Sequence, residues 1–123
     1  MGKVILVVED DPKNMKLTRD LLGISGYGSI QATDGAQGVA AAKAYKPDLV
    51  LMDIMMPKMD GYNACHAIKS DPATKNIPVI MLTALGFELN RQLAQRVGAN
   101  GYLTKPVDRQ TLLQAIGPLL GTP

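Results

Sequence analysis

"DLVLMDIMMPKMDG", from Asp48 to Gly61, places a carboxylate inside an apolar segment of the chain. Residues 49–52 are apolar, Asp53 follows at once, and further apolar residues come after it. A lone buried carboxylate costs more free energy than one side chain can recover, so Asp53 needs either an exposed edge or partners. The apolar run is continuous rather than alternating, which is typical of a strand covered on both faces of a parallel sheet.

Four similar segments occur elsewhere in the chain, and the stretches between them have helical patterns. The five predicted strands are "VILVVE" (4–9), "SIQAT" (29–33), "LVLMD" (49–53), "VIMLT" (79–83) and "GYLTK" (101–105). Strands that alternate with helices five times predict an α/β fold with a parallel sheet and right-handed crossovers.

The predicted helices begin at recognisable capping residues. Asp11-Pro12, Asp34 and Asp108 each precede a stretch with helical apolar spacing, and further helices are expected over 61–69 and 87–97. Gly117-Pro118 is expected to end or kink the last helix, because proline cannot donate a backbone hydrogen bond.

Composition limits the classes of function. A chain of 123 residues with 46% hydrophobic and 20% charged residues fits one globular domain, 1–123, without a separate output domain. The net charge is only +2 and no Lys/Arg block occurs, so no nucleic-acid partner is expected. The apolar opening is too short for a signal peptide or a membrane span, and the single cysteine, Cys65, fits a reducing cytoplasm.

Polar groups stand at the end of four predicted strands. Glu9 and Asp10 end the first, Asp53 the third, Thr83 the fourth and Lys105 the fifth. Parallel strands share one carboxyl edge, where open sheets bind ligands, so these groups are expected to converge. A single such residue is more often a helix cap or a solvated strand end, and that is the interpretation given to the aspartates at 11, 34, 48 and 108.

The converging residues suit phosphoryl chemistry. Three carboxylates repel one another unless a cation lies between them, and all-oxygen ligands favour Mg²⁺, which keeps several waters. Lys105 and Thr83 can donate to phosphoryl oxygens. Asp53 is then the expected nucleophile of a transfer that depends on positioning and charge neutralisation.

At these residues the chain resembles the receiver domain of bacterial two-component response regulators. The matching segments are "VVEDD", "LVLMDIMMPKMDG", "MLTA" and "YLTKP", and the resemblance covers the whole chain. It implies a flavodoxin-like, doubly wound sheet of order 2-1-3-4-5 and phosphorylation of Asp53 by a histidine kinase or phosphotransfer protein. It also implies Mg²⁺ on Glu9, Asp10, Asp53 and the Met55 carbonyl, and a switch made by Thr83 and Tyr102.

The same resemblance implies a signalling module that contacts a downstream protein, as a monomer or weak dimer, and that only assists its own phosphorylation and slow dephosphorylation. Glu9 replaces the commoner aspartate of the acidic pair, so its metal contact is expected to run through water. Gly101 stands where many members carry aspartate.

The sequence fits three other functions less well. An aspartate-nucleophile phosphohydrolase needs a second aspartate two residues after Asp53, where Met55 stands. A flavodoxin-like electron carrier would bind phosphate in its first loop, which here is acidic. A degenerate receiver acting as a scaffold is disfavoured by the intact Asp53, Thr83 and Lys105. Cys65 and His66 are adjacent, so on a helix they would not face each other as a nucleophile and base.

Overall fold

Five strands alternate with five helices along the chain in a computed structural model that describes residues 2–54, 60–83, 88–105 and 107–120. The elements are β1 (Val4–Val8), α1 (Pro12–Ile24), β2 (Gly28–Ala32), α2 (Gly35–Tyr45), β3 (Leu49–Asp53), α3 (Gly61–Ser70), β4 (Val79–Thr83), α4 (Glu88–Arg96), β5 (Gly101–Thr104) and α5 (Arg109–Leu120). The predicted alternation of strands and helices is confirmed.

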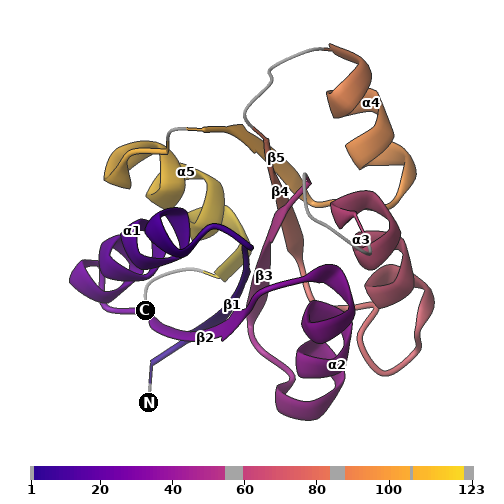
Figure 1. The fold of residues 1–123 in the computed structure, drawn as a ribbon, viewed down its shortest axis with the longest axis horizontal. Helices are drawn as coiled ribbons and strands as arrows, with labels where there is room; N and C mark the ends of the chain where they lie inside the picture. Colours follow the sequence, from indigo (N-terminus) through magenta and orange to yellow (C-terminus); the bar gives the residue numbers. More distant parts are fainter. Residues whose placement is uncertain (1, 55–59, 84–87, 106, 121–123) are drawn as a thin grey trace.

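All strands are parallel in one sheet of order β2-β1-β3-β4-β5. Helices α1 and α5 cover one face and α2, α3 and α4 the other (Figure 1). This is the doubly wound order that the resemblance implied. Strand boundaries differ from the predicted ones by a residue at most: β1 ends at Val8, one residue before Glu9, and β2 begins at Gly28.

The two faces of the sheet carry separate cores, which explains the continuous apolar runs. Successive side chains of a strand point to opposite faces. Ile5 and Val7 of β1 therefore pack in the core that includes Leu22 and Ile116, whereas Leu6 and Val8 pack in the core that includes Ala42 and Ile68. Every residue of β3 and β4 is buried, because both faces of these central strands are covered.

Each helix begins close to the carboxyl end of a strand. Asp11 caps α1 by accepting from the Lys13 N–H, and Asp34 caps α2 by accepting from the Gln37 N–H at 2.8 Å. Asp108 accepts from the Thr111 N–H at 2.7 Å. Three of the four aspartates interpreted as ordinary caps or strand ends are thus caps; Asp48, half-buried, instead accepts from the Val4 N–H at the start of the sheet.

The last helix does not end at Gly117-Pro118. It continues to Leu120 with Pro118 inside it. A proline removes one N–H and so one hydrogen bond, and in the last turn few further helical bonds depend on it. Within the described ranges, no helix combines the length and the apolar composition that crossing a bilayer requires.

Candidate functional site at the carboxyl edge of the sheet

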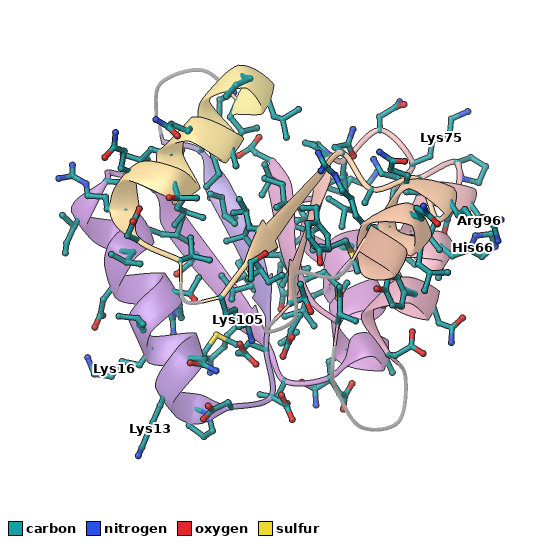
Figure 2. The ribbon with its side chains drawn as sticks, turned by 90° about the horizontal axis from the view of Figure 1, so that it is seen from above. Lys13, Lys16, His66, Lys75, Arg96 and Lys105 are labelled. Atoms are coloured by element: carbon teal, nitrogen blue, oxygen red, sulfur yellow. The ribbon has the colours of Figure 1, made fainter. Side chains whose placement is uncertain are left out.

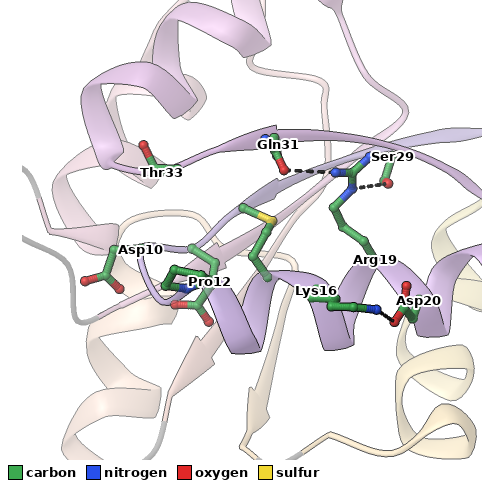
Figure 3. Close-up of a pocket in the computed structure, with 10 residues that line it drawn as sticks. Asp10, Pro12, Lys16, Arg19, Asp20, Ser29, Gln31 and Thr33 are labelled. Carbon is green, nitrogen blue, oxygen red and sulfur yellow. Dashed lines mark hydrogen bonds and ion pairs between the residues drawn. The ribbon is translucent and has the colours of Figure 1, made fainter.

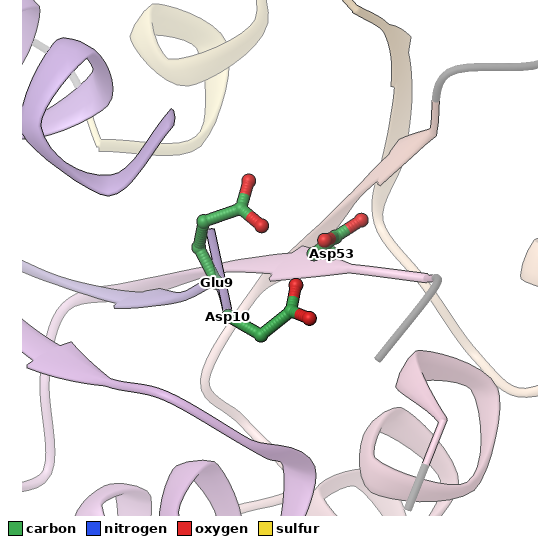
Figure 4. Close-up of side chains that lie close together, drawn as sticks. All are labelled: Glu9, Asp10 and Asp53. Atoms are coloured by element: carbon green, nitrogen blue, oxygen red, sulfur yellow. The ribbon is translucent and has the colours of Figure 1, made fainter. Parts of the chain in front are cut away.

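Three carboxylates meet where β1 and β3 end. One carboxylate oxygen from each of Glu9, Asp10 and Asp53 lies within 4.8 Å of the other two (Figure 4). The pairing of β1 with β3 sets this proximity: because Val8 is in register with Met52, Glu9, which follows β1, comes beside Asp53, the last residue of β3. The predicted convergence of the acidic residues is confirmed.

The acidic pair divides into a buried and an exposed member. Glu9 is 3% exposed; its backbone N–H donates to the Ala32 carbonyl at 3.0 Å, and its carboxylate accepts from the Asp11 N–H at 3.3 Å. Asp10 is exposed. Glu9 is therefore held in place inside the cluster, whereas Asp10 is open to solvent.

Lys105 joins the two buried carboxylates. Its Nζ lies 2.7 Å from Glu9 Oε1 and 3.3 Å from Asp53 Oδ1, and only 19% of its side chain is exposed. Its backbone N–H donates to the Thr83 carbonyl, so the pairing of β5 with β4 continues as far as Lys105. In Figure 2 Lys105 lies near the sheet, whereas labelled cations such as Lys13 and Arg96 lie on the outer surface, where they are exposed.

The electrostatics reflect this buried cluster. Burial, with the neighbouring Asp53 carboxylate, raises the pKa of Glu9 above its usual value, although Lys105 opposes the rise. Burial alone would lower the pKa of Lys105, but its hydrogen bond to Glu9 and the charges of Asp53 and Glu9 outweigh that effect and raise it. Lys105 is thus held as a cation that compensates part of the negative charge of Glu9 and Asp53.

Thr83 and Tyr102 lie on adjacent strands beside this cluster. Thr83 ends β4 and is 1% exposed. Tyr102, in β5, is half-buried and packs against the core under α2 and α3; its proximity contributes to raising the pKa of Tyr62 on α3, after burial of that phenol. Tyr102 therefore lies on the strand next to that of Thr83 and reaches the core under α2 and α3.

The oxygen donors of Glu9, Asp10 and Asp53 fit a hard divalent cation. The Met55 carbonyl, expected as a further ligand, lies outside the described residues.

Among the residues that the structure describes, two hollows open beside the cluster. One of about 510 Å³ lies between α1 and β2; Figure 3 shows Arg19 crossing it to Ser29 and Gln31, with Nε–Oγ and Nη1–Oε1 distances of 3.0 and 2.9 Å. The other, about 340 Å³, has mainly apolar walls that include Leu17 and Val107 and reaches Lys105. Sequence reasoning missed these apolar positions; the signal was an apolar residue, Leu17, on the outer face of an amphipathic helix.

The structure keeps Cys65 and His66 apart from this site. The Cys65 thiol is buried and donates to the Val97 carbonyl at 3.7 Å, whereas His66 is exposed and lies 3.4 Å from the Ser70 hydroxyl. The expectation that the two do not form a nucleophile and base is confirmed.

Comparisons with known proteins agree with this geometry. Residues 5–117 match the model of the response regulator receiver domain. Protein PilH of Pseudomonas aeruginosa is 42% identical over 116 residues, which cover 94% of this chain and 96% of PilH. The DNA-binding dual master transcriptional regulator RpaA of Synechocystis is 41% identical over 116 residues, which cover 94% of this chain but only 48% of RpaA, so the chain spans about half of that relative.

Among solved structures, the receiver domain of sensor histidine kinase PA1611 from Pseudomonas aeruginosa superposes with a TM-score of 0.91 at 34% identity. The match covers 99% of this chain and 100% of that one, which was described with a magnesium ion coordinated in its active-site cleft. The sheet order, the acidic cluster with its lysine and the matched sequence all lead to one assignment. The chain belongs to the response regulator receiver domain family.

Proposed function

We propose that this protein is a two-component response regulator of the single-domain type that accepts a phosphoryl group on Asp53, in a Mg²⁺-dependent reaction, from a histidine kinase or phosphotransfer protein. Receiver domains interact with histidine kinases and downstream targets, and they are signalling phosphoacceptors rather than conventional enzymes. The observation that carries the proposal is the placement of Lys105 Nζ, 2.7 Å from Glu9 and 3.3 Å from Asp53, at the one edge where Thr83 also ends its strand.

In the proposed transfer, a carboxylate oxygen of Asp53 attacks the phosphorus of a phosphohistidine. The new P–O bond forms as the P–N bond breaks, and the electron pair of that bond returns to the imidazole nitrogen, which takes up a proton. Lys105 neutralises charge on the phosphoryl oxygens and the Thr83 hydroxyl donates to one of them. Catalysis here is positioning and charge neutralisation by groups that the fold already holds in place.

Glu9, Asp10 and Asp53 would hold the Mg²⁺, with the Met55 carbonyl proposed as a further ligand. When bound, the ion supplies positive charge to the phosphoryl oxygens. The magnesium ion described in the PA1611 receiver supports this part of the proposal by similarity.

The donor protein would dock over the apolar hollow next to Lys105. Leu17, which is 51% exposed, lines this hollow together with Val107, and the two provide apolar area that a partner surface would cover. A phosphohistidine presented there would reach the carboxyl edge without crossing the rest of the protein.

The signal would leave through Thr83 and Tyr102. In this proposal the Thr83 hydroxyl moves toward the new phosphoryl group and the Tyr102 ring follows it, which changes the surface near α4 and α5 that a downstream protein reads. A new phosphate interaction can bias such a two-state element. A relay of the phosphoryl group to a further histidine is the second outcome compatible with the same site.

The deciding experiment incubates the protein with Mg²⁺ and phosphoramidate and measures its intact mass. We expect wild-type protein to gain the mass of one phosphoryl group. The gain should not occur when the metal is chelated before the reaction, and it should not occur in Asp53→Asn. Equal labelling of Asp53→Asn would place the acceptor elsewhere. A wild-type protein that binds Mg²⁺ yet is never labelled would favour the scaffold function instead.

A further inference from the structure

The first residue of α3 lies against the backbone of the proposed phosphoacceptor. After β3 ends at Asp53, the chain returns at Gly61, which is buried, and the Gly61 N–H donates to the Ile54 carbonyl at 3.0 Å. Asp60, just before it, caps the helix by accepting from the Asn63 N–H at 2.9 Å. The start of the helix is therefore fixed to the end of the strand that carries Asp53.

The space beside Gly61 admits no side chain. A β-carbon built on this residue would overlap the carbonyl oxygen of Asp53, and it would lie 2.8 Å from Ile54 Cα and 3.0 Å from the Asp53 carbonyl carbon. All three atoms belong to the main chain, so no rotamer change can relieve the overlap. The φ angle of Gly61 lies outside the left-handed region, so space rather than backbone conformation requires glycine here.

We infer that Gly61 is a positioning residue for the phosphoryl site: its missing side chain lets α3 close onto β3 and sets where the Asp53 carboxylate stands relative to Lys105, Glu9 and Asp10. This inference rests on the proposed function and deepens it, because it assigns a role in the site to a residue that contributes no functional side chain. A methyl group at position 61 must displace either the helix or the peptide of Asp53. Such a displacement matters, because a misplacement of about 1 Å can reduce a rate by roughly 10².

The chain offers a matched control in Gly38. A β-carbon there would lie 2.8 Å from Val8 Cγ2 and 3.1 Å from Val8 Cγ1, so Gly38→Ala also creates a close contact between a helix and a strand of the buried core. The contact falls on a side chain, however, and not on the main chain of a site residue. Gly23, with no atom within 4 Å of such a carbon, is the control for the substitution alone.

The test compares Gly61→Ala, Gly38→Ala and Gly23→Ala by three measurements. Urea unfolding gives the stability of each variant, an NMR titration with MgCl₂ gives its metal affinity, and the ¹³C shift of the Asp53 carboxyl carbon reports on the metal-free site. We expect Gly61→Ala to weaken Mg²⁺ binding and to slow phosphoramidate labelling by at least about tenfold, and to move the Asp53 signal. Gly38→Ala should lose stability while its metal affinity stays within about twofold of wild type.

Wild-type protein in enough urea to match the stability of Gly61→Ala controls for general loosening. Equal loss of metal affinity in that sample, an unmoved Asp53 signal in Gly61→Ala, or failure of Gly61→Ala to fold in buffer would each overturn the local role assigned to Gly61. Absence of labelling in wild type would reject the proposed function alone, since the Asp53 carboxyl shift in the metal-free variants still tests the positioning.

Discussion

Two groups of carboxylates lie at the same edge of this sheet, and they differ in how far along the chain their partners are. Asp11, Asp34 and Asp60 accept hydrogen bonds from backbone N–H groups two or three residues further on. Glu9 pairs with Lys105, 96 residues away, and Asp53 meets the same lysine. We call the first group the capping carboxylates and the second, with Asp10, the site carboxylates.

The comparison teaches what a carboxylate at a strand end can do. Every helix of a parallel α/β sheet starts near the carboxyl end of a strand, so caps and site residues share one edge. A capping carboxylate accepts from a backbone N–H two or three residues further on. A site carboxylate lies among like charges, and for the buried Glu9 and Asp53 the sheet topology supplies the compensating cation, Lys105.

The largest effect that can break this comparison is expected at Lys105. Lys105→Met should slow labelling of Asp53 by roughly 10²–10³, the usual result of removing one preorganised group that stabilises developing charge. Lys16→Met is the matched control, because the Lys16–Asp20 pair at 2.8 Å is on the surface with the lysine side chain 78% exposed. Intact mass gives the labelling rate of each variant. A rate for Lys105→Met within threefold of the rate for Lys16→Met would show that the site carboxylates do not depend on their distant cation.

The second effect concerns Mg²⁺ itself. Adding Mg²⁺ at about 100 times its dissociation constant should raise the free energy of unfolding by about 2.7 kcal/mol, since only the folded chain gathers the site carboxylates. Asp10→Asn should lose most of this gain. Asp60→Asn, the same substitution at an exposed capping residue, should keep it. Urea unfolding with MgCl₂ or EDTA measures both, and a loss of equal size in the two variants would erase the distinction between the groups.

The third effect tests a capping residue. Asp34→Ala should lower the free energy of unfolding by about 1 kcal/mol, because the Gln37 N–H loses its acceptor, while the labelling rate stays within twofold of wild type. Asp34→Asn should restore most of the stability, since asparagine caps nearly as well. Slower labelling by Asp34→Ala at unchanged stability would assign Asp34 to the site group instead.

What could be predicted from the sequence differs between the capping carboxylates and the site carboxylates. The caps at Asp11, Asp34 and Asp108 could be predicted because their signals are local. The convergence of Asp53 with Lys105 could be predicted too, because parallel strands share an edge and the order of the elements was regular.

The remaining features of the site depend on distances between strand ends, which no sequence pattern specifies. That Lys105 lies closer to Glu9 than to Asp53, and that Glu9 is buried while its neighbour Asp10 is exposed, result from the three-dimensional packing of strand ends. The contact of Gly61 with the Asp53 backbone is of the same kind, since the sequence showed only a glycine at a helix start. The prediction that Gly117-Pro118 ends or kinks the last helix was wrong about the end: α5 continues to Leu120, because the cost of proline depends on how many helical bonds follow it.

The smallest expected effect concerns Cys65, a buried acid that has no role in the site and that extends the comparison of the two carboxylate groups. Burial raises the pKa of the Cys65 thiol to about 11, although the nearby Lys69 acts in the other direction. An unfolded cysteine titrates near pH 8.5, so above that value the unfolded chain releases a proton that the native state keeps. The stabilising contribution is therefore complete below about pH 8.5 and is lost as the pH rises toward 11.

Between pH 8 and pH 9 this linkage should lower the free energy of unfolding by roughly half a kcal/mol. Cys65→Ala removes the titrating group, and its own cost in packing is the same at both pH values, so the difference between the two proteins isolates the thiol. Urea unfolding of both proteins at pH 8 and pH 9 measures this difference. An equal decline in Cys65→Ala would assign the alkaline loss to other groups, and would mean that burial does not control the protonation of Cys65.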